Sequence, residues 1–156
     1  MKESQKKSSK KSLGTSEPSP IKARNLLKLQ LYTLRSEFQV GDMDMKPRCP
    51  FCGRRVPKDN ADLHEALISK GMVAGLEDRD WINVRYNCVI RHHDSPGCSH
   101  TGGVGGDEAF EKAARYLAKW EGYTQIREWL KKVTTVYPEL ADVQRRFEAI
   151  DWSGDE

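Results

Sequence analysis

The stretch Cys49-Pro50-Phe51-Cys52-Gly53 carries the strongest structural signal in the chain, because it places two thiols three positions apart across a tight turn. Two thiolates at this spacing can both reach one tetrahedral Zn²⁺ at about 2.3 Å, and the glycine frees the backbone to turn toward the sulfurs. A thioredoxin-like redox pair would lie where a strand meets a helix, but Arg54-Arg55-Val56-Pro57 is a poor helix start. The motif therefore predicts a structural zinc knuckle, with a redox pair or free thiols as the alternative.

A second pair of ligands must follow, because two thiolates do not close a structural zinc site. The candidates lie in Asn87-Cys88-Val89-Ile90-Arg91-His92-His93-Asp94-Ser95-Pro96-Gly97-Cys98-Ser99-His100. Cys98 follows a Pro-Gly turn that would expose it as a ligand, whereas Cys88 lies in an apolar, strand-like run and is interpreted as a buried core thiol. The predicted zinc ligands are Cys49, Cys52, His92 and Cys98, with His93 as the alternative fourth ligand.

Charge is distributed unevenly along the chain. Its 156 residues carry a formal net charge of +3, but residues 1–48 hold 11 Lys/Arg against 5 Asp/Glu, and the rest is close to neutral. Residues 1–19 are rich in Lys and Ser and too polar to form a core, so they are predicted to be a disordered basic arm. Such an arm is typical of a chain that meets a polyanion, although a solubilising tail has the same composition.

Composition excludes several classes of protein. Apolar residues make up 37% of the chain and charged residues 31%, which is compatible with one folded domain and a tail. No apolar run approaches the roughly 18 residues that a membrane span needs, and the stretch from Met1 to Ser12 has no secretory signal. We expect a cytoplasmic protein without membrane association, and neither a secreted disulfide scaffold nor a large multidomain enzyme.

The N-terminal part of the chain is predicted to contribute a helix to an α+β fold. Residues 20–46 are expected to form a helix and a linker, since Ser19-Pro20 is a typical helix start and Gly41 would follow the helix end. The apolar residues at helical spacing are Leu27, Leu31, Leu34 and Phe38. Leu27, Leu29 and Leu31 also alternate as they would in a strand, which leaves a strand as the alternative.

Residues 47–107 are predicted to be the zinc-bound core, and residues 108–156 a helical extension that packs on it. Three amphipathic helices are expected in the extension, with Gly122 ending the first, Thr124 capping the second and Pro138 opening the third. Their inward faces are predicted to be Phe110, Ala113, Ala114, Leu117 and Trp120, then Ile126, Trp129, Leu130 and Val133, then Leu140, Val143 and Phe147. Such faces are more typical of core packing than of ligand binding.

Two histidines, His64 and His100, lie outside the predicted zinc ligands. In Asp62-Leu63-His64-Glu65, a strand would place Asp62 and His64 on one face. The alternative is a short helix from Asn60 to Lys70, stopped by Gly71, with His64 on a solvated face. The glycine-rich stretch from Thr101 to Gly106 lacks the Lys-Ser/Thr of a P-loop, so it is interpreted as a flexible turn into the next helix.

The combined pattern resembles the HNH endonucleases of the His-Me finger, or ββα-metal, class. The residues that carry the resemblance are Cys49, Cys52, His64, Asn87, His92, Cys98 and His100. The stretch Tyr86–His93, and later Ala113–Leu117, Gly122-Tyr123 and Trp129-Leu130, also look like small HNH proteins encoded by phages. The resemblance covers about residues 47–132 and implies a small zinc-stapled ββα core that is treble-clef-like.

The resemblance also implies a mechanism, in which DNA phosphodiester bonds are hydrolysed with one catalytic divalent ion, Mg²⁺ or Mn²⁺, and a separate structural zinc. His64 would be the general base, since imidazole has an unperturbed pKa near 6.5 and is largely neutral at pH 7. His100 would bind the catalytic ion, with Asp62 or Glu65 completing its shell. Asn87 would fix the loop or orient His64, with Asn83 as a weaker candidate. No small-molecule cofactor is expected.

The expected partner is DNA, held through its phosphates by the basic arm and by Arg54, Arg55, Arg85 and Arg91. The alternative function is a non-catalytic, zinc-stabilised nucleic-acid-binding module on the same scaffold, which would need neither His64 nor His100. A thiol-redox enzyme is a third hypothesis, and it predicts that zinc chelation leaves the fold intact. Strand preference, cleavage site and oligomeric state stay open.

Overall fold

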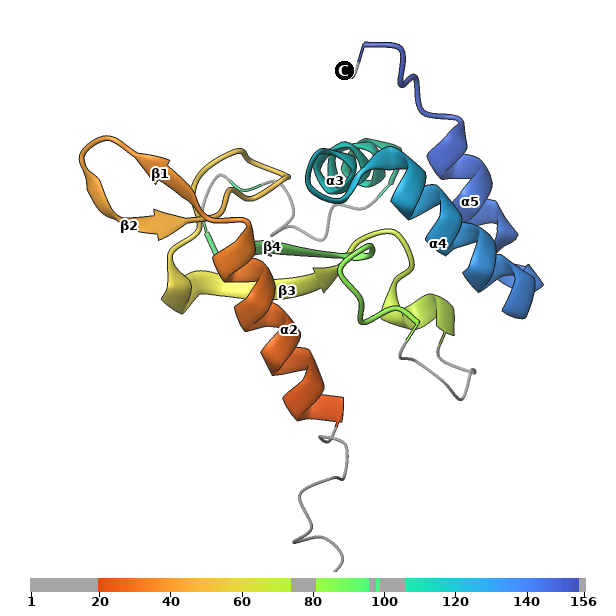
Figure 1. The fold of residues 1–156 in the computed structure, drawn as a ribbon, viewed down its shortest axis with the longest axis horizontal. Helices are drawn as coiled ribbons and strands as arrows, with labels where there is room; N and C mark the ends of the chain where they lie inside the picture. The colour runs from red at the N-terminus through yellow and green to blue at the C-terminus, as the bar shows by residue number, and fades with distance from the viewer. Residues whose placement is uncertain (1–19, 74–80, 96–97, 99–105, 155–156) are drawn as a thin grey trace, which may run out of the picture.

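A computed structural model describes residues 20–73, 81–95, 98 and 106–154 (Figure 1). Within these residues the chain forms two small antiparallel sheets and four α-helices, which confirms a mixed α+β fold. The predicted basic arm, residues 1–19, and His100 lie outside the described residues. None of the helices in the described part combines the length and the apolar composition that a membrane-spanning segment needs.

The first described helix, α2 (Pro20–Leu34), is followed by a hairpin of β1 (Glu37–Gln39) and β2 (Asp42–Lys46). The prediction of a helix through Phe38 is therefore wrong, and the expected linker is partly folded. The reason lies in the sequence after α2, where polar and apolar residues alternate on both sides of Gly41. Gly41 has a φ of +90°, which suits the hairpin turn rather than a helix end.

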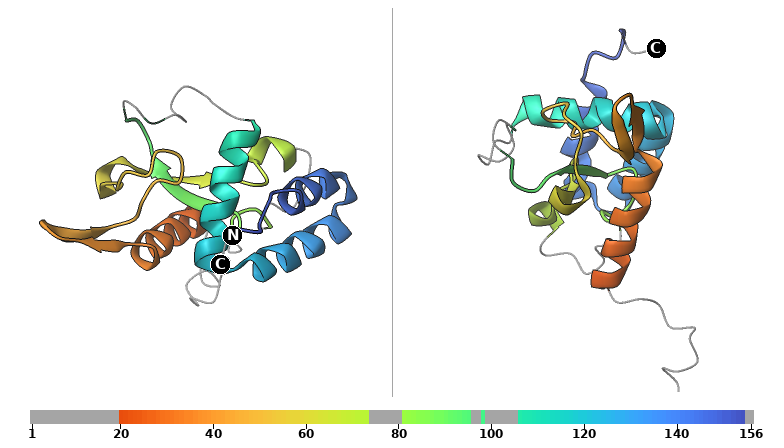
Figure 2. Two further views of the ribbon diagram at one scale, coloured as in Figure 1. Left: turned by 90° about the horizontal axis from the view of Figure 1, so that it is seen from above. Right: turned by 90° about the vertical axis from the view of Figure 1, so that its left-hand side faces the viewer.

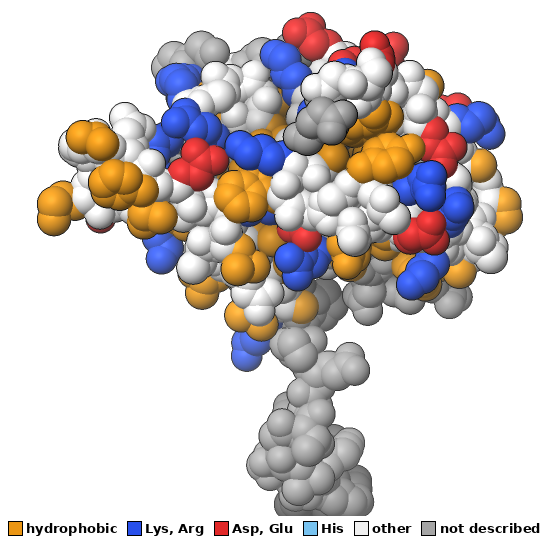
Figure 3. Space-filling view, turned by 45° about the horizontal axis from the view of Figure 1, so that its top comes forward, with side chains coloured by type: hydrophobic (Ala, Val, Ile, Leu, Met, Phe, Trp, Pro, Cys, Tyr) orange, Lys and Arg blue, Asp and Glu red, His pale blue; other side chains and the backbone are white. Residues whose placement is uncertain are grey.

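The hairpin projects from one end of the molecule (Figure 1). Its large apolar side chains are mostly exposed: Phe38 is 71% exposed, Val40 86% and Met43 98%. Figure 3 shows hydrophobic side chains gathered at the projecting end of the molecule, with Lys and Arg side chains beside them. The hairpin thus presents apolar surface to solvent instead of to the core.

The second sheet pairs β3 (Ala61–Glu65) with β4 (Cys88–His92) in antiparallel register. The strand alternative for His64 is thereby confirmed, and the alternative helix from Asn60 to Lys70 is not formed. Short 3-10 turns, Lys58–Asn60 and Lys70–Val73, flank the strand instead. Because paired residues share a face, Asp62, His64, Val89 and Arg91 lie on one face of the sheet. Leu63, Glu65, Cys88, Ile90 and His92 lie on the opposite face.

Three helices follow: α3 (Asp107–Glu121), α4 (Tyr123–Val136) and α5 (Ala141–Glu148). The predicted inward faces are confirmed, except that Trp120 is only half-buried. The prediction that Thr124 caps the second helix is wrong. Gly122 is both the C-cap of α3 and the N-cap of α4. Its φ of +94° bends the chain, and its N–H donates to the Ala118 carbonyl at 2.9 Å.

The second sheet lies between α2 and α3, and both helices contact β4 (Figure 2). Arg24 of α2 donates to the Leu63 carbonyl at 2.7 Å and to Glu65 at 3.2 Å, so α2 covers the face that carries Glu65. Lys112 of α3 donates to the Phe51 carbonyl at 3.4 Å, which places α3 beside the zinc knuckle. The two strands are therefore held from both sides.

Arg35, just after α2, is a buried charged residue at the centre of this arrangement. Its side chain is only 1% exposed, and it donates to the carbonyl oxygens of Cys88 at 2.6 Å and Arg85 at 2.9 Å. It also forms an ion pair with Glu121 at 2.9 Å. One guanidinium thereby joins the end of α2, the start of β4 and the end of α3.

Candidate metal centre

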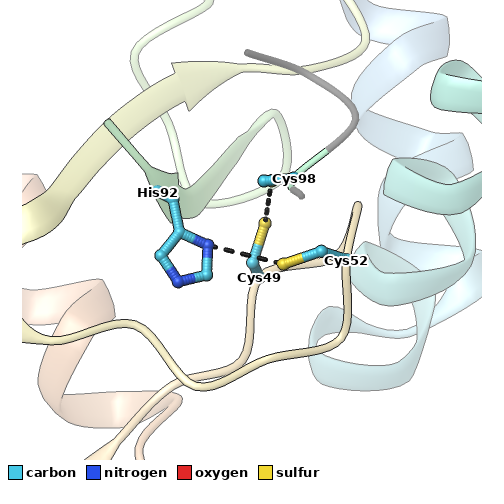
Figure 4. Close-up of side chains that lie close together, drawn as sticks. All are labelled: Cys49, Cys52, His92 and Cys98. Carbon is cyan, nitrogen blue, oxygen red and sulfur yellow. Dashed lines mark hydrogen bonds between the residues drawn. The ribbon is translucent and has the colours of Figure 1, made fainter. Parts of the chain in front are cut away.

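Four ligand atoms converge at one end of the second sheet (Figure 4). The side chains of Cys49, Cys52, His92 and Cys98 place these atoms within 4.8 Å of one another. Cys49 Sγ lies 3.7 Å from Cys98 Sγ, and Cys52 Sγ lies 3.4 Å from His92 Nδ1. These four residues are the predicted zinc ligands.

The observed separations fit a tetrahedral zinc ion. Zn–S bonds of about 2.3 Å and a Zn–N bond of about 2.0 Å separate two sulfurs by about 3.8 Å and sulfur from nitrogen by about 3.5 Å. A disulfide would need an S–S distance of about 2.0 Å. The Cys49–Cys98 distance of 3.7 Å matches two ligands of one ion rather than a disulfide. The cluster can therefore bind zinc with all four positions filled by protein.

The knuckle is shaped by its own backbone. Gly53 N–H donates to the Cys49 carbonyl at 2.8 Å, and Cys49 N–H donates to the Arg54 carbonyl at 2.9 Å. Gly53 has a φ of +78°, a conformation that favours glycine, so the turn depends on this residue. The closed turn directs both thiols of the motif to the same side.

Strand alternation decides between His92 and His93. His92 is buried at the end of β4, and its Nε2 lies 3.2 Å from the Arg55 carbonyl. Donation from Nε2 leaves Nδ1 as the ligand atom, a common arrangement around metal-bound histidines. Burial lowers the pKa of His92, which favours the neutral ring that a metal requires. His93 is exposed, and its backbone N–H donates to Asn60.

The two thiols Cys52 and Cys88 have opposite electrostatic environments. Burial alone would raise the pKa of Cys52. Hydrogen bonds from the Arg54 backbone and from neighbouring side chains have a larger combined effect in the opposite direction, so the pKa lies below its ordinary value. The thiolate is therefore favoured at Cys52. Burial raises the pKa of Cys88 to about 12, and its Sγ donates to the Ile82 carbonyl at 3.4 Å. Cys88 is confirmed as a core thiol.

The candidate catalytic His64 packs on the zinc knuckle. Its ring lies edge-on to the ring of Phe51, with the centroids 5.8 Å apart and an interplanar angle of 70°. Phe51 stands between the ligands Cys49 and Cys52 in the chain. Asp62 shares the face of His64 and pairs with Arg91 at 3.4 Å. Glu65 lies on the opposite face, where it pairs with Arg24.

Asn87 fixes the long connection between β3 and β4. Its buried amide accepts hydrogen bonds from the N–H groups of Leu67 and Ile68, both at 2.9 Å. It also donates to the carbonyls of Ile68 and Ile82, both at 2.9 Å. These four bonds use the full capacity of the side chain. Of the two predicted roles for Asn87, the geometry supports fixing the loop, whereas Asn83 Oδ1 is buried without a hydrogen-bond partner among the described residues.

We expect replacement of Asn87 by alanine to lower the free energy of unfolding by about 3 kcal/mol or more, because it removes four hydrogen bonds to buried backbone groups. Urea unfolding of the zinc-loaded protein measures the change. The matched variant is Asn83→Ala, whose Oδ1 has no hydrogen-bond partner in the part of the chain that the structure describes, and it is expected to cost about 1 kcal/mol or less. Equal losses in the two variants would contradict the role given to Asn87.

The four arginines predicted to contact DNA lie in different settings. Arg54 and Arg55 line one hollow beside the knuckle. Arg55 is held by the hairpin, since it donates to Asp42 at 2.9 Å and to the Glu37 carbonyl at 2.6 Å. The other two are engaged in ion pairs, Arg85 with Glu121 at 2.6 Å and Arg91 with Asp62 at 3.4 Å. Arg54 is exposed, and its Nη2 donates to Ser95 Oγ at 3.2 Å.

The chain matches none of the protein-family models, curated proteins or solved structures with which it was compared. Function must therefore be inferred from the residues and their geometry.

Proposed function

We propose that the protein is a metal-dependent endonuclease of the HNH type, which hydrolyses DNA phosphodiester bonds on a zinc-stapled, treble-clef-like ββα core. The observation that carries this proposal is the edge-on contact between His64 and Phe51 at 5.8 Å, which places a histidine directly against the zinc knuckle. The chain order also supports it, because β3, β4 and α3 follow one another as the ββα unit requires.

His64 acts as the general base in this mechanism. It lies in mid-sheet on the face of Asp62 and Arg91, and it is only partly buried, so water and a phosphate can approach it. Its imidazole takes a proton from water, the resulting hydroxide attacks the phosphorus in line, and the 3′ oxygen leaves. Arg91, on the same face, supplies a positive charge next to the scissile phosphate.

Two different metal sites follow from the two donor sets. The Cys₃His cluster has no open position, so zinc there is structural and does not take part in the chemistry. Asp62 and His100 would hold Mg²⁺ or Mn²⁺, which supplies charge stabilisation on the phosphate and the leaving oxygen when bound. Asp62 fits this role because its carboxylate is partly exposed, at 31%, on the face that carries His64.

The test is cleavage of supercoiled plasmid by the zinc-loaded protein with Mg²⁺, with Mn²⁺ and with EDTA. We expect nicked or linear DNA only with added Mg²⁺ or Mn²⁺, and circular dichroism and zinc content must show that the EDTA sample is still folded. The absence of cleavage with every metal, from a folded and zinc-bearing protein, would contradict the proposal. That result would favour the alternative function, a non-catalytic nucleic-acid-binding module on the same scaffold.

A further inference from the structure

An open hollow of about 470 Å³ lies between the β1–β2 hairpin and the zinc knuckle. Four cationic side chains line it, from Lys46, Arg48, Arg54 and Arg55, against a single carboxylate, that of Asp42. The hollow is separate from the face of the second sheet that carries His64. Its lining has a marked excess of positive charge.

The cations of the hollow are not equally engaged. Asp42 is shared between Lys46 at 2.6 Å and Arg55 at 2.9 Å, so one carboxylate balances two cations. Arg48 donates from Nε to Glu37 at 3.0 Å and from Nη1 to the Gly53 carbonyl, yet its side chain is 45% exposed. Arg54 donates to Ser95 Oγ at 3.2 Å, and its side chain is exposed. Arg48 and Arg54 therefore present charge to an incoming anion.

The hairpin above the hollow adds apolar contact surface. Phe38, Val40 and Met43 are at least 71% exposed, and exposed apolar side chains gathered in one place commonly mark an interaction site. Phe38 and Met43 alternate along the strands with Gln39 and Asp42, which line the hollow. The hairpin thus has a polar side that borders the hollow and an apolar side that is open to solvent.

We propose that the β1–β2 hairpin and the hollow beneath it form a docking surface for DNA, which deepens and rests on the proposed nuclease function. Phosphates bind in the hollow at Arg48 and Arg54, and Phe38, Val40 and Met43 contact bases and sugars. DNA fits because it offers anionic phosphates and apolar base surfaces within one ligand. A two-stranded ribbon is also narrow enough to enter the major groove, where one side meets the backbone and the other the base edges.

The experiment measures the affinity of the zinc-loaded protein for a short labelled duplex by fluorescence anisotropy, over a series of salt concentrations and without Mg²⁺ or Mn²⁺. We expect Arg48→Ala to weaken binding several-fold and to lower the salt slope by about 1. The double variant Phe38→Ser/Val40→Ser is expected to weaken binding about tenfold with an unchanged slope, since it removes apolar contacts and no charge.

Lys132→Ala is the matched control, because Lys132 is an exposed cation on α4, far along the chain from the hairpin. It is expected to bind as the wild type does, and thermal melting confirms that every variant is folded. Wild-type affinity in both Arg48→Ala and Phe38→Ser/Val40→Ser would overturn the docking surface. A failure of the wild-type protein to bind DNA would also overturn it, and would point to a protein as the partner. If hairpin-dependent binding is found but plasmid cleavage is absent, the docking surface stands and the nuclease proposal fails.

Discussion

Replacement of Cys49 by serine is expected to abolish zinc binding and cooperative unfolding together. The four ligands come from the knuckle, from the end of β4 and from the segment after it, so a zinc ion bound there would join the knuckle to residues at least 40 positions further along the chain. Structural zinc sites of this kind supply about 10–16 kcal/mol. That is comparable to the whole stability of an ordinary domain, which is about 5–15 kcal/mol.

Zinc content by mass spectrometry and thermal unfolding by circular dichroism measure this effect. Cys88→Ala is the matched control, because it removes a thiol that is buried in the core and outside the cluster. It should keep one zinc ion per chain and lose only about 1–2 kcal/mol. A Cys49→Ser protein that lacks zinc but melts as the wild type does would contradict the structural role and support the redox interpretation of the motif.

The buried ion pair between Arg35 and Glu121 is expected to have the second largest effect. Arg35→Met should lower the free energy of unfolding by about 3–5 kcal/mol, because it leaves the buried Glu121 carboxylate without its buried cation and removes the hydrogen bonds to the Cys88 and Arg85 carbonyls. Arg85 still contacts Glu121, but its side chain is 52% exposed and cannot replace the buried cation. Urea unfolding of the zinc-loaded protein measures the loss.

A double-mutant cycle separates this pair from general damage to the core. Arg35→Met/Glu121→Gln should lose less than the sum of the two single variants, since the second change removes the unpaired charge. Arg145→Ala breaks an exposed pair with Asp142, in which both side chains are 70% exposed, and should cost less than about 1 kcal/mol. Strict additivity in the cycle would contradict the coupling of Arg35 to Glu121.

The zinc ligands could be predicted from the sequence because their spacing reflects local geometry. The C-x2-C motif fixes a turn, and Cys98 after Pro-Gly is the typical partner of such a turn. The choice between His92 and His93 stayed open because it depends on the register of β4 with β3. In the structure Ala61 pairs with His92, which turns this histidine into the cluster and leaves its neighbour exposed.

The helical extension was also predictable, because the spacing of apolar residues within each segment indicates both the helix and the side that it buries. The hairpin was missed because Leu27, Leu31, Leu34 and Phe38 continue one helical spacing across the true helix end. An apolar residue at such a spacing is expected to be buried, yet Phe38 is 71% exposed. The alternation around Gly41 was the signal that could have revealed the two strands.

The role of Arg35 could not be predicted, because its partners lie far away in the sequence. They are 50 residues away at Arg85, 53 at Cys88 and 86 at Glu121. A single arginine after an amphipathic segment is typical of an exposed helix end. Only the tertiary fold shows that it is 1% exposed and joins three elements.

The central claim is that the zinc-stapled β3–β4 unit presents His64 to a phosphodiester bond, and the most direct test is the rate of DNA cleavage by His64→Ala. The control is His93→Ala, which removes an exposed histidine that directly follows the last residue of β4. Both variants should keep their zinc. We expect His64→Ala to cleave about 10²–10⁴-fold more slowly than the wild type, with His93→Ala unchanged. Cleavage by zinc-loaded His64→Ala at the wild-type rate would contradict the account.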